Sequence, residues 1–387
     1  MAEFVGTRVI NAAGAHDRSY QTLFHARAPV SGFTGAAPVV RYEIRRTDPS
    51  EAKSEILCLW SRNFQGLPEG RYAWIYESNP SGRATCWLAV EADSGTVVGS
   101  TALFPRRFTI RGEPRVAGVA ADFSVDSRHR GFGPALALQN AAVSACAPSG
   151  FSFLYGVSTS KSAPVQQRAG YRMIGNSYRL AKVFRTAPYL RRIGGAGAMG
   201  LLARIGDAIL SGGAKERWSR TPPGLALEIL SSFDARFDQL WQRASAARRL
   251  SADRSSEYLN WRFARCPERT YTTYALVREV NREVLGYLVT RDTAEVIHIA
   301  DFYVGNHENM ADVLLTQFLR LQRRKGASSV SASYFGSGAF VKKLQEFGFS
   351  LRDRESVVLA YIPPGSRDAS WIRDPENWCL FEADADT

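Results

Sequence analysis

The sequence has few of the residues that build disulfide frameworks and metal sites. Its 387 residues include only five cysteines and five histidines. The number of cysteines is odd and no two of them form a CxxC pair, so we expect neither a disulfide framework nor a metal site. A reducing, cytoplasmic setting suits such a chain. The scattered cysteines are Cys58, Cys86, Cys146, Cys266 and Cys379.

Long apolar runs are also lacking. No stretch reaches the length and apolarity of a membrane-spanning helix, and the opening residues MAEFVGTR contain no apolar signal core. With 45% hydrophobic and 22% charged residues, the composition is that of an ordinary globular protein. The length suggests two or three domains, each large enough to bury a core of its own.

Negative charge is in deficit, because 37 acidic residues stand against 49 basic ones and give a net charge of +12. Such an excess raises the local concentration of anionic partners. The charge by itself does not choose between a phosphate-bearing coenzyme, an acidic carrier protein, nucleic acid and anionic lipid.

The segment from Ala121 to Pro134 has the pattern of an anion-binding loop. It reads ADFSVDSRHRGFGP: a short apolar strand, a basic loop with spaced glycines, and a proline suited to a first helical turn. The two glycines leave backbone amides free to turn toward one point, and the following helix adds the positive end of its dipole. Arg128 and Arg130 add formal charge. The pattern therefore predicts a site for a diphosphate.

The spacing Arg128-x-x-Gly131-x-Gly133, between a strand and a helix, resembles the signature of the GNAT acyltransferase superfamily. The resemblance implies that acetyl-CoA or another acyl-CoA binds here, with its pyrophosphate on the loop. It also implies that the pantetheine arm lies in a splay between this strand and Phe151–Val157. Pro134 has no N–H, so the loop offers one donor fewer than usual. The implied cofactor-binding residues are Phe123, Ser124, Val125, Arg128, His129, Arg130, Gly131, Phe132, Gly133 and Thr159.

An internal repeat organises the chain. The recurring pairs are WIYESNP (74–80) with WRFARCP (261–267), VVG (97–99) with VLG (284–286), ADFSV (121–125) with ADFYV (300–304), and AGY (169–171) with FGF (347–349). The four landmarks keep their order and nearly their spacing. They predict two copies of one fold, residues 38–185 and 224–365.

Within each copy, alternating strand patterns mix with helical ones, so the fold class is α/β with a mixed twisted sheet. Both copies resemble GNAT domains, and the chain resembles a tandem GNAT protein. The second copy is degenerate, because GNHENMAD after Val304 has no Gly-x-Gly and no arginine. We therefore expect cofactor binding in the first copy only, with the second walling the acceptor cleft or stabilising the first.

Three segments lie outside the two copies. Residues 1–37 are expected to be a partly disordered or surface-lying extension. The spacing of apolar residues in the linker 186–223 predicts a basic amphipathic helix. We favour packing of this helix on the two domains over contact with anionic lipid or a carrier protein. In the tail 366–387, Trp371 and Trp378 are expected to fasten to the body, while the acidic end is expected to be mobile.

The catalytic candidates are Asp122, Tyr155 and Gln166. In the GNAT pattern the thiolate acid is a tyrosine four positions before a Gly-aromatic pair, and here that position is Gln166, with Thr159 in place of the usual asparagine. Tyr155 or Tyr171 could supply the acid, or each could be a core aromatic. Asp122 could be the base, although Asp301 at the same place of the second copy favours a structural role.

Three functions remain open at this point. The first is transfer of an acyl group from coenzyme A to the amine of a small molecule such as an amino sugar or amino acid. The second keeps the fold but takes the acyl group from an acyl carrier protein or an aminoacyl-tRNA, as the Fem-type transferases do. The third is a non-catalytic acyl-CoA-binding protein, suggested by the missing tyrosine. Nucleic acid as a partner is disfavoured by the intact pyrophosphate loop.

Overall fold

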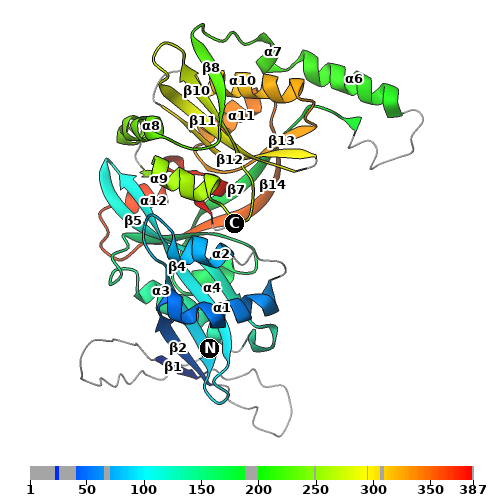
Figure 1. The fold of residues 1–387 in the computed structure, drawn as a ribbon. Helices are drawn as coiled ribbons and strands as arrows, with labels where there is room; N and C mark the ends of the chain where they lie inside the picture. Colours follow the sequence, from blue (N-terminus) through cyan, green and yellow to red (C-terminus); the bar gives the residue numbers. More distant parts are fainter. Residues whose placement is uncertain are drawn as a thin grey trace.

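Two halves of similar build share one twisted sheet in the computed structural model (Figure 1). The strands follow each other in the order β1-β2-β3-β4-β5-β6-β14-β7-β13-β12-β11-β10-β8. The structure describes residues 22–25, 41–64, 70–131, 133–187, 199–247, 250–293, 295–305 and 309–385. Across these ranges no helix combines the length and apolarity that a membrane crossing needs.

The first copy follows the predicted α/β succession. Its strands are β2 (Arg41–Thr47), β3 (Thr85–Glu91), β4 (Val97–Ile110), β5 (Glu113–Val125), β6 (Phe153–Ser158) and β7 (Arg172–Val183). Its helices are α1 (Pro49–Asn63), α2 (Gly70–Tyr72), the π-helix η1 (Ala73–Glu77), the 3-10 helix η2 (Ser127–His129), α3 (Pro134–Ser144) and α4 (Ala163–Arg168). Asp48 caps α1 by accepting a hydrogen bond from Ser50 N, and Pro49 occupies the first turn.

Alternation along β3 explains why helices cover both faces of this sheet. Cys86 and Leu88 point to the face that packs against α1, while Trp87 points to the opposite face and packs with α3. Each of these three side chains is at most 4% exposed. The sheet of the first copy is therefore a middle layer between α1 and α3.

The second copy repeats the succession. Its strands are β8 (Leu225–Leu230), β9 (Leu250–Ala252), β10 (Thr272–Arg278), β11 (Val284–Asp292), β12 (Val296–Val304), β13 (Ser329–Gly336) and β14 (Ser350–Tyr361). Its helices are α8 (Ala235–Ala247), α9 (Ser256–Leu259), the π-helix η3 (Asn260–Ala264), α10 (Met310–Arg324) and α11 (Gly338–Glu346). The repeat landmarks fall at equivalent places, since Gly99 pairs with Val125 across β4 and β5, and Gly286 pairs with Val304 across β11 and β12.

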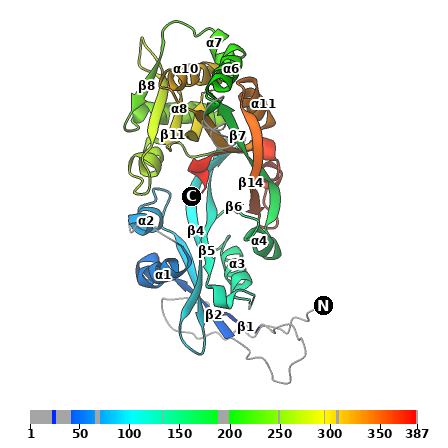
Figure 2. The ribbon, with the colours of Figure 1, turned by 90° about the vertical axis from the view of Figure 1, so that its right-hand side faces the viewer.

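The last strand of each copy lies in the sheet of the other. β14 of the second copy pairs antiparallel with β6 and with β7 of the first. β7 of the first copy in turn pairs antiparallel with β13 of the second. Both views show these strands crossing the junction of the two halves (Figure 1; Figure 2). Each half thus completes its sheet only with a strand of its neighbour.

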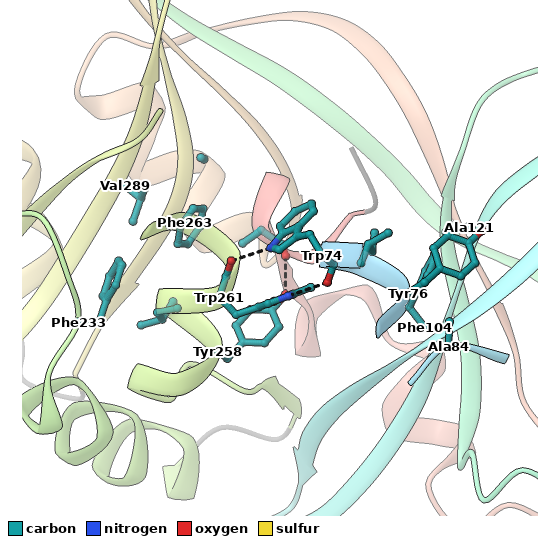
Figure 3. Close-up of a cluster of buried hydrophobic side chains, with 14 of the residues drawn as sticks. Trp74, Tyr76, Ala84, Phe104, Ala121, Phe233, Tyr258, Trp261, Phe263 and Val289 are labelled. Atoms are coloured by element: carbon teal, nitrogen blue, oxygen red, sulfur yellow. Dashed lines mark hydrogen bonds between the residues drawn. The ribbon is translucent and has the colours of Figure 1, made fainter. Parts of the chain in front are cut away.

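The two π-helices meet in a hydrophobic core that both copies share. Trp74 Nε1 donates to Trp261 O at 2.8 Å, and Trp261 Nε1 donates to Trp74 O at 2.9 Å (Figure 3). The two indole rings stack with centroids 5.0 Å apart. The first landmark of the repeat in one copy therefore contacts the same landmark in the other copy.

The extension and the linker are only partly described. Within the expected extension, β1 (Thr22–His25) pairs antiparallel with β2, so this part is an edge strand. The other residues of 1–37 lie outside the described ranges. The linker contains the predicted helix as α6 (Met199–Gly212), followed by α7 (Lys215–Trp218). α7 packs on the body, because the fully buried Glu216 pairs with Lys182 of β7 at 3.1 Å.

The tail folds back onto the body, as its tryptophans predicted, and Glu382–Asp384 of the acidic end, which was expected to be mobile, packs against the body. The tail elements are α12 (Ala369–Arg373), η4 (Pro375–Asn377), β15 (Cys379–Leu380) and η5 (Glu382–Asp384). Trp378 is 1% exposed. Asp384 is buried between Arg106 of the first copy, at 3.0 Å, and Arg254 of the second, at 2.6 Å. Acidic composition alone suggested solvent exposure, and two distant arginines overturn that expectation.

Candidate active site

A gap between two parallel strands forms the centre of the candidate site. β5 and β6 pair only at Ala117–Phe153, Gly118–Leu154 and Val119–Tyr155. Beyond these pairs the strands diverge, so the facing backbone groups of β5 and β6 are not bonded to each other. The predicted splay is therefore present, at the predicted place.

The gap has the features of a cradle for an extended ligand. A side chain at Gly156 would meet Ala120 O, because a Cβ there would lie 3.1 Å from that oxygen. Ser124 Oγ is buried and has no hydrogen-bond partner among the described residues. A buried hydroxyl without a partner costs free energy unless a ligand or water satisfies it. Phe123 and Val125, on the same strand, belong to the hydrophobic cluster around α3.

The glycine loop follows directly after β5. Gly131 and Gly133 have φ angles of 96° and 101°, a region that non-glycine residues rarely adopt. A Cβ at Gly131 would meet no atom within 4 Å, so the glycine serves the backbone conformation rather than packing. The first hydrogen bond of α3 is from Ala137 N to Gly133 O, which leaves the preceding amides of the turn without helical partners. The amides and the helix dipole together suit an anion.

Only part of the loop's charge is available to a ligand. Arg128 is exposed and makes no hydrogen bond or ion pair with the other described residues. Arg130 donates to Val125 O at 3.0 Å, which braces the turn. His129 Nδ1 lies 3.0 Å from the Tyr42 hydroxyl, so this ring nitrogen is engaged within the protein. Phe132 lies outside the described residues.

The loop is fastened to the end of α1. Asp126 forms an ion pair with Arg62 at 3.0 Å and accepts a hydrogen bond from Asn63 at 2.6 Å. These contacts fix the start of the loop relative to the helix layer, so its amides are preorganised.

Asp122 lies on a bulge in β5, between the gap and the glycine loop. The register of β4 and β5 shifts between Ser100 and Ala102, and Asp122 has a φ of 47°. Its carboxylate lies 3.1 Å from Arg71, and Arg71 also lies 2.8 Å from Glu268. All three side chains are at most 8% exposed. Glu268 belongs to the second copy, so both copies contribute to this cluster.

A buried tyrosine borders the same cluster. Burial, followed by the charge of Asp122, raises the pKa of Tyr76 well above its usual value. Tyr76 stacks on Tyr72 with ring centroids 4.3 Å apart. These rings make the region around Asp122 largely apolar, which strengthens any ionic contact formed there.

Gln166 faces the gap but is already engaged. Its side chain is 3% exposed and accepts a hydrogen bond from Ser158 Oγ of β6. Its amide nitrogen would lie 3.6 Å from a Cβ at Gly156. Thr159 is exposed just after β6 and bonds Ser162 through its amide and hydroxyl. Gln166 is therefore placed at the gap, whereas Thr159 serves the turn into α4.

The expectation that Tyr155 could act as the acid is not supported by its surroundings. Its hydroxyl donates to Asp384 O of the tail at 3.0 Å, and the residue is 0% exposed. Burial, followed by the charge of Asp384, raises its pKa far above the usual value. Tyr171 is also buried, and burial raises its pKa in the same way. Both tyrosines are core aromatics in this structure.

Sequence reasoning missed Arg71 and Glu268. Their signal was present but weak, because Arg71 precedes the repeated Trp74 by three positions and Glu268 directly follows the repeated Pro267. The repeat was interpreted as a mark of duplication, and the contact between its two copies was not considered. No local pattern tells which residues flanking a repeat will meet.

In the second copy, the tail fills part of the corresponding gap. β12 and β13 pair in parallel only from Val296–Ser329 to Ile299–Ala332. Farther along, β15 pairs antiparallel with the end of β13. The gap is therefore present in both copies, and in the second the chain itself fills part of it.

Comparison with known proteins agrees with this geometry. Residues 43–174 match the family model of the acetyltransferase (GNAT) domain. This segment of the chain belongs to the GNAT acetyltransferases, the class of enzymes that transfer an acyl group from acyl-CoA to an acceptor. The match covers the gap, the glycine loop and Asp122. No curated protein matches the chain.

Solved structures with the same fold extend over both copies. A probable N-acyltransferase from Enterococcus faecalis V583 superposes with a TM-score of 0.61 at 12% identity, covering 84% of this chain and 73% of that one. A GCN5-related N-acetyltransferase from Anabaena variabilis ATCC 29413 gives 0.58 at 14%, covering 83% and 73%. A tandem GNAT protein from the clavulanic acid biosynthesis pathway gives 0.51 at 14%, covering 83% and 98%. The predicted tandem fold is confirmed.

Proposed function

We propose that the chain is an N-acyltransferase that moves an acyl group from acyl-CoA to the amine of a small molecule, of the amino-sugar or amino-acid type. The observation that carries the proposal is the arrangement of groups around the β5–β6 gap. The glycine loop lies at one end of the β5–β6 gap, and the Asp122–Arg71–Glu268 cluster lies beside that gap. A donor held through its diphosphate by the loop and an acceptor held by the carboxylates can meet there.

The residues of the first copy fit coenzyme A as the donor. The loop amides around Gly131 and Gly133, with the exposed Arg128, suit the pyrophosphate. The unpaired strand edges beside Ser124 and Gly156 suit an amide-containing arm, which can add to them as a further strand would. When bound, acyl-CoA supplies an acyl group activated as a thioester.

The acceptor amine is proposed to approach from the side of Asp122 and Glu268. Two carboxylates of opposite copies face one guanidinium in a region of low exposure. Carboxylate oxygens accept hydrogen bonds from an amine or ammonium group and orient it. Because the carboxylate of Asp122 is ion-paired with Arg71, we assign Asp122 to orienting the acceptor before any role as base.

No tyrosine is needed as acid in this scheme. Tyr155 is held by the tail, and Gln166 cannot release a proton. A thiolate is a stable leaving group, so a hydrogen bond from an amide suffices to hold it. We assign Gln166 to positioning beside the gap.

The test is an acetyl-CoA assay on the full chain with a panel of amino sugars and amino acids. Release of free thiol and the mass of the acylated product are followed together. In Glu268→Gln, the acceptor KM should rise about tenfold, as for loss of a charge-assisted hydrogen bond, while acetyl-CoA affinity stays unchanged. Glu279→Gln, an exposed carboxylate of the same copy, is the matched control and should behave as wild type.

Three outcomes would overturn the proposal. Turnover that requires an acyl carrier protein would move the donor to that partner. Transfer from aminoacyl-tRNA would favour the Fem-like alternative. Tight acyl-CoA binding without transfer to any amine of the panel would favour a non-catalytic binding protein.

A further inference from the structure

A pocket of about 360 Å³ lies in the second copy, where the β12–β13 gap ends. Phe302 and Val304 line it, and these residues are the repeat counterparts of Phe123 and Val125 in the first copy. The pocket is thus the remnant, in the second copy, of the gap proposed to hold the arm of acyl-CoA in the first.

The tail gives this pocket one of its walls. β15 pairs with the end of β13, Leu380 with Phe335 and Cys379 with Gly336. Gly336 has a φ of 146°, and a Cβ there would lie 2.1 Å from Trp378 O, so only glycine allows the tail this close. The position of this wall therefore depends on the glycine at position 336 of β13.

Five of the eleven residues that line the pocket are aromatic. Tyr334 lies 4.9 Å from Phe340 and 5.0 Å from Phe381, ring centroid to ring centroid. Phe302 lies 5.1 Å from Phe340. A dry apolar cavity of about 150 Å³ already takes up a benzene ring. This pocket has room for a ring with a short side chain.

The exposed Glu376 is the one carboxylate among the lining residues of the pocket. Glu376 lines it and accepts hydrogen bonds from Gly338 N with both oxygens, at 3.0 and 3.1 Å. Each carboxylate oxygen keeps further lone pairs for a second donor. The lining residues of the pocket include no lysine or arginine. Aromatic faces and a carboxylate together attract an organic cation.

We propose that this pocket binds an arylalkylammonium ion, with its ring among Phe302, Tyr334 and Phe340 and its ammonium group at Glu376. The site is separate from the acyl-transfer site of the first copy and does not depend on the function proposed for that site. Its lining includes a carboxylate and no lysine or arginine, whereas the glycine loop of the first copy has Arg128 and Arg130.

Titration calorimetry of the full chain tests the proposal, with phenethylamine as the cation and phenethyl alcohol as its neutral counterpart. Phenethylamine should bind at least about fivefold more tightly than the alcohol, as expected for a cation near aromatic faces at a partly open site. Glu376→Gln keeps an oxygen to cap Gly338 N but removes the charge, and should weaken phenethylamine binding about fivefold. Phe340→Trp should abolish it by filling the pocket.

Glu346→Gln is the matched control, since it removes an exposed carboxylate at the far end of α11, and it should bind as wild type. The proposal is overturned if phenethylamine produces no binding heat, or if the alcohol binds as tightly as the amine. It is equally overturned if Glu376→Gln and Phe340→Trp, both folded by circular dichroism, bind phenethylamine as wild type does.

Discussion

The two copies have the same succession of elements and differ in what fills the gap between their central parallel strands. In the first copy, as far as the structure describes the chain, β5 and β6 pair with each other only up to Val119–Tyr155, and β5 continues into a loop with two left-handed glycines. In the second copy the tail strand β15 occupies the end of the gap, and the loop sequence has no Gly-x-Gly. A duplicated fold has thus kept its architecture in both copies, while the features that suit a diphosphate remain in only one.

The copies also depend on each other. β14 and β7 are exchanged between the sheets, and Glu268 reaches the cluster around Asp122. Sequence analysis assigned the second copy to walling the cleft or to stabilising the first copy. The exchanged strand fits a stabilising role, while the walling of an acceptor cleft stays a prediction, to which the contact of Glu268 with Arg71 gives a test.

The largest effect is expected from separating the copies. A fragment ending at residue 223 lacks β14, so β6 and β7 lose the strand between them. Unpaired backbone in the middle of a sheet is unfavourable, and we expect this fragment to show no cooperative thermal unfolding. Mixing it with a fragment from residue 224 onward should restore the transition. A fragment that unfolds cooperatively by itself would show that the strand exchange is dispensable.

The next effect concerns the shared tryptophan pair. Trp74→Ala and Trp261→Ala should each lower the free energy of unfolding by about 3–5 kcal/mol, since each removes a large buried side chain and a hydrogen bond across the junction. The two losses should be similar, because the contacts are reciprocal. Urea denaturation measures both. A loss confined to one variant would contradict the symmetry of the junction.

Asp122 and Asp301 occupy matching places in the two copies, but we expect Asp301 to affect stability and Asp122 to affect kinetics. Asp301 is fully buried and lies 2.9 Å from Arg254, so Asp301→Asn should lower the free energy of unfolding by about 3 kcal/mol. The turnover of the folded Asp301→Asn variant should equal that of wild type. Asp122→Asn should lower kcat/KM for the acceptor about tenfold or more. Equal kinetics for the two folded variants would remove Asp122 from the site.

The smallest effect is expected at Tyr155. Tyr155→Phe removes one hydrogen bond, to Asp384 O, and should cost about 1 kcal/mol of unfolding free energy. Turnover at saturating substrate and its pH profile should stay as in wild type. If this variant folds but loses its turnover, Tyr155 is the acid after all, and the structural role given to it is wrong.

The sequence predicted the fold well because its signals are local. The repeat spacing, the strand before the loop and the helix after Pro134 each depend on a few neighbouring residues, and all appear in the structure. Strand exchange could not be predicted, since alternation along β14 says that a strand forms and not which strand it joins. The same limit left the role of Tyr155 open between acid and core aromatic, because the pattern of β6 does not reveal that its hydroxyl donates to Asp384 O of the tail.

The acidic tail illustrates a second limit. Composition predicted a mobile end, but Asp384 meets Arg106 and Arg254, which are 278 and 130 positions away in the chain. Pairing at such separations depends on the completed fold. The candidate site shows the same division, with the loop visible in the sequence and the Arg71–Glu268 contact visible only in the structure.

The central claim, that only the first copy binds acyl-CoA, is tested most directly by titration calorimetry with acetyl-CoA. The account predicts one site per chain, lost in Gly131→Val, because a β-branched residue at a φ of 96° distorts the loop. The loss should be at least about tenfold in affinity, or about 1.4 kcal/mol. Gly365→Val, at a φ of 78° with open space around it, is the matched control and should bind normally. Two sites per chain, or unchanged binding in Gly131→Val, would contradict the account.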